Sequence, residues 1–371
     1  MIAGTALAAY GHGDWNDALQ PADPHLREHL CSAWTVTLHF KMLTTLARAL
    51  RASGRPTDAQ PLEQAARAVR RDFDRLLLVD GVVAGYALFD AGGAVRHLLF
   101  PKDDVTGVHY SALAMIHAIL EDLFSPQQAR EHVRLMETYL HGPDGLRLFD
   151  RPMAYHGGPQ RLFQRAESAT FFGREIGLMY THAHLRYAEA LAHMGESERF
   201  FHALCQANPI GIQSVVLSAT ARQSNCYYSS SDAAFKDRYQ ASAEYDRVAR
   251  GTIALDGGWR VYSSGAGISL GLIVRHFLGL DFGADGLRLD PVMPSRLDGL
   301  RAETTLRGRA ISIQYRVGAR GCGVQSVVLN GQALLFERQL NPHRDGASLV
   351  GWKSVLGLLG DAGNQLQIGI G

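Results

Sequence analysis

The chain has 371 residues, of which 46% are hydrophobic and 20% are charged, a balance typical of a globular protein with a sizeable core. Lys and Arg number 37 against 36 Asp and Glu, so the formal net charge of +1 provides no basic excess for nucleic acid and no acidic tail. The cysteines, Cys31, Cys205, Cys226 and Cys322, form no CxxC pair, which disfavours a structural zinc site or a disulfide framework and favours a cytoplasmic setting.

Apolar residues at helical spacing predict helices through the first three quarters of the chain. One stripe recurs every four positions and predicts a long helix over 26–50, ended by Ser53-Gly54; it consists of Leu30, Trp34, Leu38, Met42, Leu46 and Leu50. Short β-prone runs predict a small hairpin within 81–99. Further helices are predicted over 59–78, 108–124, 126–140, 174–194, 197–206 and 266–278, and none of these apolar runs reaches the roughly 20 residues of a membrane span.

Two later segments of the chain, 207–262 and 283–371, have different patterns. Residues 207–262 show no sustained helical period and are expected to form a long polar loop. After Gly283, strands are predicted at 287–289, 311–315 and 324–329, with a hairpin turn at Asn330-Gly331. The fold expected is therefore mainly α with β: an incomplete α/α-barrel catalytic region over 1–282, followed by an antiparallel β-sandwich module over 283–371.

The segment Gly11-His12-Gly13-Asp14-Trp15-Asn16-Asp17 carries the clearest chemical signal. It places two carboxylates three residues apart around an indole. Glycosidic chemistry needs an acid that protonates a leaving oxygen, and a nearby aromatic ring can pack on a sugar and raise the pKa of that acid by desolvation. The alternative is a polar loop with an Asx-type helix cap.

Three further stretches hold polar residues in places that a hydrophobic core would exclude. His182 and His184 are two residues apart on a predicted helix, so they cannot share a metal; one could bind an anion or a sugar hydroxyl while the other packs. The small residues around Ser263 and Ser264, just before a helix, suit an anion such as phosphate, or alternatively form a helix cap. The run Tyr227-Tyr228-Ser229-Ser230-Ser231-Asp232 suits sugar hydroxyls, or alternatively is an ordinary surface loop.

These motifs, in this order, resemble those of glycoside hydrolase family 94, the inverting glycoside phosphorylases. The run from Gly11 to Pro24 is most similar to the branch that acts on β-1,2-glucan, which includes oligoglucan phosphorylases and the C-terminal region of cyclic β-1,2-glucan synthases. Gly258-Trp259-Arg260-Val261-Tyr262-Ser263-Ser264-Gly265 and Leu289-Asp290-Pro291-Val292-Met293-Pro294 point to the same branch. The resemblance extends over almost the whole chain.

The resemblance implies roles for individual residues. Asp17 corresponds to the general acid of the family, and Asp14 and Trp15 would line the subsite of the transferred sugar. The residues implied to bind phosphate are His182, Ser264 and Gly265, the last two standing where the family has a Thr-Gly pair. The residues implied to face the acceptor are Arg174, Glu175, Tyr227 and Tyr228.

The activity implied by the resemblance is inverting phosphorolysis of β-1,2-glucan, or the reverse glucosyl transfer, with inorganic phosphate as co-substrate and no cofactor or metal. Family members carry an N-terminal β-sandwich, a helical linker, a complete (α/α)6 barrel and a C-terminal β module. The chain is accordingly expected to supply the second half of the barrel within a larger cyclic β-1,2-glucan synthase-like protein. The expected partners are a β-glucan or oligosaccharide and phosphate, in a homodimer located in the cytoplasm or on the cytoplasmic side of a membrane-associated synthase.

Other functions stay open from the sequence. An inverting hydrolase would use a second carboxylate to activate water, and its product formation would not depend on phosphate. A non-catalytic fragment would bind β-1,2-glucan without releasing a sugar phosphate. A purely structural helical scaffold would tolerate replacement of Trp15.

Overall fold

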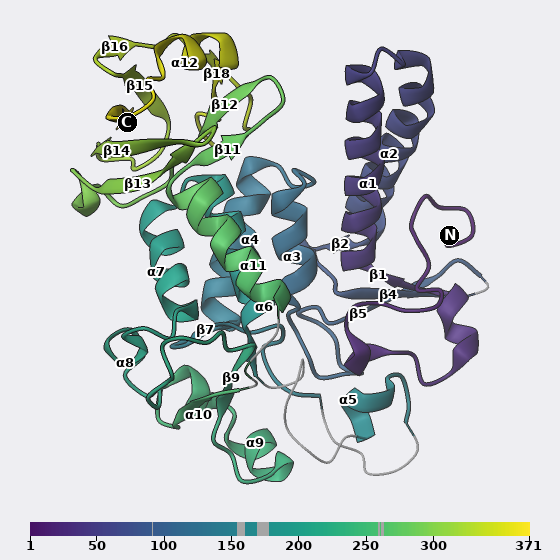
Figure 1. Cartoon of the computed structure of the whole chain (residues 1–371). Coiled ribbons are helices and arrows are strands. Elements are labelled where there is room, and N and C mark those ends of the chain that lie inside the picture. Colours follow the sequence, from purple (N-terminus) through teal and green to yellow (C-terminus); the bar gives the residue numbers. More distant parts are fainter. Residues whose placement is uncertain (91, 154–159, 169–177, 259, 261–262) are drawn as a thin grey trace. The chain divides into compact units, whose positions relative to one another are not determined.

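The computed structural model describes residues 1–90, 92–153, 160–168, 178–258, 260 and 263–371, and for Asp17, Arg165, Ser168, Ser263 and Ser264 it describes the backbone alone. Figure 1 draws the whole chain. The chain divides into two compact units. Unit 1 comprises 1–184 and 209–261, and unit 2 comprises 185–208 and 262–371.

Unit 1 combines helices with short antiparallel sheets. Its helical segments are η1 (Asp17–Leu19), η2 (Pro24–Glu28), α1 (Ala33–Ala52), α2 (Pro56–Leu76), α3 (Ala112–Leu120), α4 (Pro126–Tyr139), α5 (Gln164–Ser168), the start of α6 (Thr181–Met194), α8 (Ile212–Val215), α9 (Arg238–Glu244) and α10 (Asp246–Ala249). Its strands are β1 (Leu30–Ser32), β2 (Leu78–Val79), β3 (Val82–Val83), β4 (Tyr86–Phe89), β5 (Val95–Leu98), β6 (His141–Gly142), β7 (Gly145–Leu146), β8 (Met179–Tyr180), β9 (Ser230–Ala233) and β10 (Leu255–Gly257).

Helices α1 and α2 lie side by side as an antiparallel pair (Figure 1). Ser32 caps α1 by accepting from the backbone N–H of Thr35, and Ser53-Gly54 ends the helix as predicted, with Gly54 at φ +73°. The apolar stripe that predicts this helix is not its buried face. The helix buries Ala33, Val36, Phe40, Leu43 and Ala47, whereas Met42 and Leu46 of the predicted stripe are 58% and 49% exposed. The helix is apolar on two sides, so spacing alone could not identify the buried one.

Unit 1 contains two three-stranded sheets. One includes β1, which leads directly into α1, and the other includes β8, which leads directly into α6. In the first sheet β4 pairs with both β1 and β5, which confirms the hairpin expected within 81–99 and adds a third strand to it. In the second sheet, of order β10-β9-β8, the central strand β9 comes from the segment expected to be a long loop. The expectation of a structureless 207–262 is therefore wrong, because helices and strands of three to seven residues are too short to produce a periodic signal.

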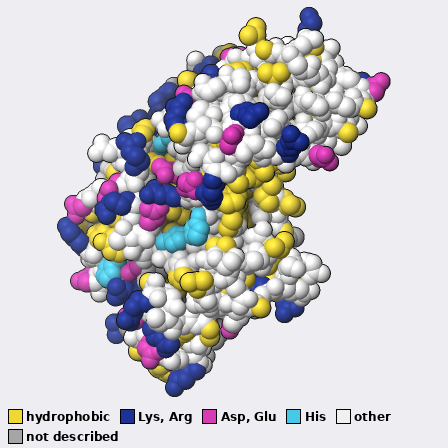
Figure 2. All heavy atoms as spheres, turned by 90° about the vertical axis from the view of Figure 1, so that its left-hand side faces the viewer, with side chains coloured by type: hydrophobic (Ala, Val, Ile, Leu, Met, Phe, Trp, Pro, Cys, Tyr) yellow, Lys and Arg dark blue, Asp and Glu magenta, His cyan; other side chains and the backbone are white. Residues whose placement is uncertain are grey.

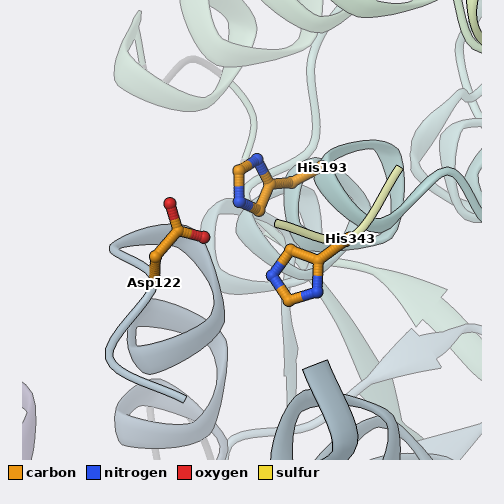
Figure 3. Close-up of side chains that lie close together, drawn as sticks. All are labelled: Asp122, His193 and His343. Carbon is orange, nitrogen blue, oxygen red and sulfur yellow. The ribbon is translucent and has the colours of Figure 1, made fainter. Parts of the chain in front are cut away.

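Unit 2 contains the remainder of α6, then α7 (Ser197–Ala207), α11 (Ser263–Leu272), the π-helical turn η3 (Ile273–Phe277) and the β-rich C-terminal part. The strands and short helices of that part are β11 (Leu280–Phe282), β12 (Gly286–Leu289), η4 (Ser295–Leu297), β13 (Arg301–Leu306), β14 (Arg309–Val317), β15 (Val324–Leu329), β16 (Gln332–Ala333), β17 (Glu337–Arg338), β18 (Ser348–Gly351), α12 (Trp352–Leu358) and β19 (Asn364–Ile370). Figure 3 shows His193 and His343 of this unit, whose rings meet edge to face with centroids 5.1 Å apart.

The C-terminal part holds a four-stranded sheet, β11-β12-β18-β17, and a five-stranded sheet, β13-β14-β19-β15-β16. Their shared core includes Leu289, Ile313, Tyr315, Val350 and Ile368, all at most 1% exposed. The predicted turn at Asn330-Gly331 is confirmed, since both residues have positive φ and join β15 to β16. The expectation of a wholly antiparallel module is wrong, because β14 pairs with β19 in parallel after a long crossover through β15–β18 and α12.

The predicted division between residues 282 and 283 falls inside unit 2, and the assignment of functional domains stays a prediction. Among the described residues, none of the helices is long and apolar enough to cross a membrane. On the face drawn in Figure 2, Lys and Arg side chains are interspersed with Asp and Glu, in keeping with the formal net charge of +1.

Candidate active site

The Asp14-Trp15-Asn16-Asp17 segment forms a rigid turn in unit 1. The Asn16 side chain, only 2% exposed, accepts from the backbone N–H of Ala18 at 3.3 Å and caps η1. Ala18 and Leu19 are buried immediately after it, so the backbone of Asp17 is fixed from both sides. The side chain of Asp17 lies outside the described residues. An Asx-type cap is therefore present within the motif, alongside the candidate carboxylates.

The same loop is attached to the segment before α5. The backbone N–H of Ala22 donates to Leu162 O at 2.8 Å, and that of Gln164 donates to Gln20 O at 2.9 Å. Glu167, which is 3% exposed, accepts from three backbone N–H groups of residues 161–163 at 2.6–2.8 Å. This carboxylate is fully engaged in holding the neighbouring turn, which gives the motif a firm support.

Asp14 anchors the loop to the start of α1. Its Oδ1 accepts from the backbone N–H of Asn16 at 3.2 Å, and its Oδ2 accepts from the Thr35 hydroxyl at 3.3 Å. Burial raises the pKa of Asp14 above its usual value, although hydrogen bonds from Ser32, Asn16, Thr35 and the Trp15 backbone oppose that rise. The donors that surround Asp14 come from the protein itself, so this carboxylate fixes the position of Trp15.

Trp15 lies in an aromatic cluster that joins distant parts of the chain. Its ring centroid is 5.2 Å from that of Tyr180 and 5.8 Å from that of His182, both in edge-to-face geometry, and 6.2 Å from that of Trp34. Tyr180 and His182 are in turn stacked, with centroids 6.4 Å apart and an interplanar angle of 20°. The ring of His117 extends the cluster, because its centroid lies 6.1 Å from that of Trp34. The early loop and the start of α6 therefore meet at one half-buried aromatic surface.

Tyr227 lies beside the same cluster. The sheet pairing of β8 with β9 places residues 227–229 next to the start of α6, where the backbone N–H of Thr181 donates to Ser229 O at 3.0 Å. Burial raises the pKa of the Tyr227 hydroxyl well above its ordinary value, Tyr180 adds to this rise, and a hydrogen bond with the Thr181 side chain opposes it. Three of the predicted sites, Trp15, His182 and Tyr227, thus come together.

His184 has a structural role. It is 0% exposed, and its Nδ1 accepts from the backbone N–H of Leu146 at 3.0 Å. Gly145, at φ +127°, leaves room for the imidazole, because a Cβ there would lie 2.7 Å from Nδ1. One of the two histidines is expected to pack in the interior, and His184 is the one that does.

Tyr228 is more enclosed than its neighbour. It is 6% exposed, its ring lies against the guanidinium groups of Arg222 and Arg260 at 5.6 and 5.9 Å, and its hydroxyl accepts from the backbone N–H of Gln223 at 2.8 Å. The serines that follow it, Ser229–Ser231, are at most 6% exposed and lead into the central strand β9. The surface-loop alternative for this run is therefore wrong.

Several predicted site residues cannot be placed. Arg174 and Glu175 lie outside the described residues, and so does the side chain of Ser264. Ser264 and Gly265 belong to the first turns of α11, in unit 2. The phosphate site assembled from His182, Ser264 and Gly265 stays a prediction.

Sequence reasoning missed Tyr180, Trp34 and Thr35. Tyr180 ends β8 and His182 lies in the first turn of α6, so no single strand or helix period relates their two rings. Trp34 was assigned to a hydrophobic stripe, although an indole carries a polar N–H and suits a half-buried position. The contact of Thr35 with Asp14 depends on how the loop packs on α1, which no local pattern reveals.

Comparison with known proteins gives two similarities. The chain is 39% identical over 356 residues, 96% of its length, to a 1,2-beta-oligoglucan phosphorylase of Listeria innocua serovar 6a, of which it spans 32%. A solved structure named sialidase superposes on 93% of this chain with a TM-score of 0.54 and 11% identity, covering 28% of that structure, which is a likeness of fold alone. No family model matches the sequence. The chain thus spans about a third of the length of the curated relative, and the α/α toroid stays a prediction.

Proposed function

We propose that this chain carries the acid-bearing part of a glycoside phosphorylase that acts on β-1,2-glucan oligosaccharides by inversion. The observation that carries the proposal is the ring contact between Trp15 and His182 at 5.8 Å, because it joins the motif expected to hold the sugar to the motif expected to hold phosphate. The similarity to a 1,2-beta-oligoglucan phosphorylase supports the same activity.

In the proposed reaction Asp17 donates a proton to the interglycosidic oxygen while phosphate attacks the anomeric carbon from the opposite face of the sugar. The glycosidic bond breaks, the new bond forms to a phosphate oxygen, and the product is α-glucose 1-phosphate. Phosphate is already an anion, so this reaction needs no second carboxylate to activate the nucleophile, unlike inverting hydrolysis.

The other residues would bind and position. Trp15 would pack on the transferred glucose, and Asp14, held by Thr35 and the Asn16 backbone, would keep the loop in place at the sugar subsite. His182, Ser264 and Gly265 would hold phosphate. The acceptor side is proposed to consist of Arg174, Glu175 and Tyr227, with Tyr228 supporting Tyr227 from its enclosed position.

The test compares Asp17→Asn with Asp23→Asn, a matched change at an exposed aspartate six residues further along the loop. Formation of α-glucose 1-phosphate from a β-1,2-gluco-oligosaccharide and phosphate is measured for the wild type and both variants. Loss of a general acid should reduce the rate by about 10²–10⁴-fold in Asp17→Asn, with Asp23→Asn unchanged. Near-wild-type turnover in Asp17→Asn would contradict the assignment of Asp17 as the general acid.

Two other results would favour the alternatives. Glucose release that proceeds equally well without phosphate would identify an inverting hydrolase. Retained binding of β-1,2-glucan with no product would identify a non-catalytic glucan-binding fragment. The homodimer, the cytoplasmic location and the place within a larger cyclic β-1,2-glucan synthase-like protein are part of the same proposal.

A further inference from the structure

Unit 1 contains a second concave site that shares no residue with the Trp15–His182 cluster. It is a cavity of about 570 Å³, lined by residues from the segments 106–107, 139–142, 147–152 and 242–249. Small-molecule sites typically fall between roughly 300 and 1,000 Å³. Exposed residues such as Tyr139 and Ser242 lie among the lining, so the cavity opens to solvent.

The floor of this cavity is a buried but electrically balanced network. Arg147, with its side chain 4% exposed, donates from both terminal nitrogens to the Asp144 carboxylate at 2.7 and 3.1 Å. Tyr245 lies near the same guanidinium, and burial raises the pKa of its hydroxyl to about 12, although Arg147 opposes that rise. Gly142 is needed beneath the guanidinium, because a Cβ there would overlap it. The floor therefore offers polar groups without a net charge.

One wall presents a planar donor. Asp150 is fixed by the backbone N–H groups of His109 and Tyr110, which donate to its Oδ1 at 2.8 and 3.0 Å. Its Oδ2 accepts from Nε of Arg151 at 3.1 Å. Among the described residues Arg151 makes no other hydrogen bond, and its side chain is 57% exposed, so its terminal nitrogens are available to a ligand. A guanidinium held in this way suits vicinal hydroxyl groups.

Another part of the lining presents an aromatic face. Tyr139, at the end of α4, is 47% exposed, and its ring stacks on that of Tyr110 with centroids 4.2 Å apart and an interplanar angle of 8°. Burial raises the pKa of Tyr110 to about 12, and a hydrogen bond with Tyr139 adds to the rise. Because the partner ring holds it in place, Tyr139 offers a pre-ordered apolar surface to the C–H face of a sugar ring.

These features favour a neutral, hydroxyl-rich ligand over an anion. The charged residues of the lining are Arg147, Arg151, Asp150 and Asp246, and Arg147 is already paired with Asp144, so the cavity has no positive excess. Phosphate and nucleotide sites commonly use Arg or Lys side chains that no carboxylate neutralises, or the N–H groups at the start of a helix. We propose that this cavity is a second saccharide-binding site, which holds a neutral oligosaccharide against Tyr139 and Arg151 and shares no residue with the site of the proposed chemistry. The identification of that oligosaccharide as β-1,2-glucan rests on the proposed function.

The test measures binding of a β-1,2-gluco-oligosaccharide and, separately, of inorganic phosphate to the 371-residue chain by isothermal titration calorimetry. Tyr139→Ala should weaken binding of the oligosaccharide at one site by about tenfold, because the aromatic face is lost. Ala243→Trp, at an exposed lining position, should fill the cavity and abolish that site without removing a core side chain. Tyr239→Ala is the control. Tyr239 lies on α9, as Ala243 does, but it is outside the lining and 69% exposed, so its replacement should leave binding unchanged.

An unchanged number of oligosaccharide sites, with unchanged affinities, in both Tyr139→Ala and Ala243→Trp would overturn the proposal, as would phosphate binding that both variants abolish. Asp17→Asn separates this proposal from the proposed function, because it should stop phosphorolysis and leave the cavity site intact. If Asp17→Asn keeps full turnover while Tyr139→Ala loses binding, the proposed function fails and the second saccharide site stands. If no β-1,2-gluco-oligosaccharide binds but a neutral cello-oligosaccharide binds in a Tyr139-dependent way, the site stands and the glucan assignment fails.

Discussion

His132 is held as a neutral imidazole inside unit 1. Its Nδ1 hydrogen bonds to Gln128 O at 2.7 Å, and its Nε2 accepts from the backbone N–H of Val83 at 3.2 Å. The ring is 0% exposed and stacks on Phe124 with centroids 4.0 Å apart. A second proton on Nε2 would face the N–H of Val83 with no acceptor available, and burial accordingly lowers the pKa of His132 from 6.5 to about 4.

This lowered pKa predicts a loss of stability in mild acid. The unfolded chain takes up a proton near pH 6.5, whereas the folded chain does so only near pH 4, so the free energy of unfolding should fall across that window by about 3 kcal/mol. Urea unfolding of wild type and His132→Gln at pH 7 and pH 4 measures this contribution. The variant starts less stable but should lose less on acidification, whereas His25→Gln, at an exposed histidine, should follow the wild type. An equal pH dependence in wild type and His132→Gln would contradict the assignment.

Residues near the candidate acid show which properties a sequence can reveal. The Asp-Trp-Asn-Asp spacing identified a loop with a cap and a possible acid, because those features are local. Burial raises the pKa of Asp14 while Ser32 and Thr35 at the start of α1 oppose the rise, and two ring partners of Trp15 lie at or just before the start of α6. The pKa of Asp14 and the ring contacts of Trp15 both depend on long-range packing. The sequence therefore indicated which residue types are present, but only the structure shows which residues surround them.

At the scale of single elements, α1 presents two apolar sides of which one is buried. Leu43 is 6% exposed and packs inward, whereas Leu46, three residues later, is 49% exposed. The two leucines share residue type, helix and local propensity, so only burial distinguishes them. This makes α1 a direct test of which side forms the core.

Leu43→Ala should lower the free energy of unfolding by about 2–5 kcal/mol, because it removes buried methyl groups and leaves a cavity. Leu46→Ala should change it by less than about 0.5–1 kcal/mol, because its side chain is largely in water. Urea unfolding followed by circular dichroism compares the two variants. A loss at Leu46 equal to that at Leu43 would mean that the exposed stripe is covered in solution.

The elements that the sequence predicted best are those with chemical signals at their ends. Ser125 and Gln128 form a capping box at the start of α4, and the predicted start at Pro126 is confirmed. Gly195, at φ +79°, ends α6 as predicted. The strands and short helices between 212 and 257 escaped because their stability comes from sheet pairing and burial, as for Ser231 at 0% exposure, and not from periodic apolar residues.

At the scale of the whole molecule, unit 2 joins segments that are distant in the sequence. Arg344 donates from both terminal nitrogens to the Asp290 carboxylate at 2.5 and 2.8 Å, and from Nε to the carbonyl oxygens of Ala192 and His193 at the end of α6. Gly195 leaves room for it, since a Cβ there would lie 2.7 Å from Arg344 Cδ. This one side chain therefore links the helical segment 185–208 to the β-rich part of the unit.

Replacing Arg344 should loosen unit 2 and leave unit 1 intact. Arg344→Met leaves Asp290 without its buried partner, which should cost about 3–5 kcal/mol locally. The carbonyls of Ala192 and His193 keep Gly195 N–H and the Asn341 amide as donors. Arg344→Lys should be intermediate, because it keeps the charge and loses the planar fork. Arg320→Met, which breaks an exposed pair with Asp345, should cost less than about 1 kcal/mol. Hydrogen exchange followed by mass spectrometry resolves the location: amides of the C-terminal half of α6, α7 and β12 should exchange faster, while α3 and α4 keep their protection. Equal acceleration in α3 and α4 would show that the two units unfold together and that Arg344 stabilises the molecule as a whole.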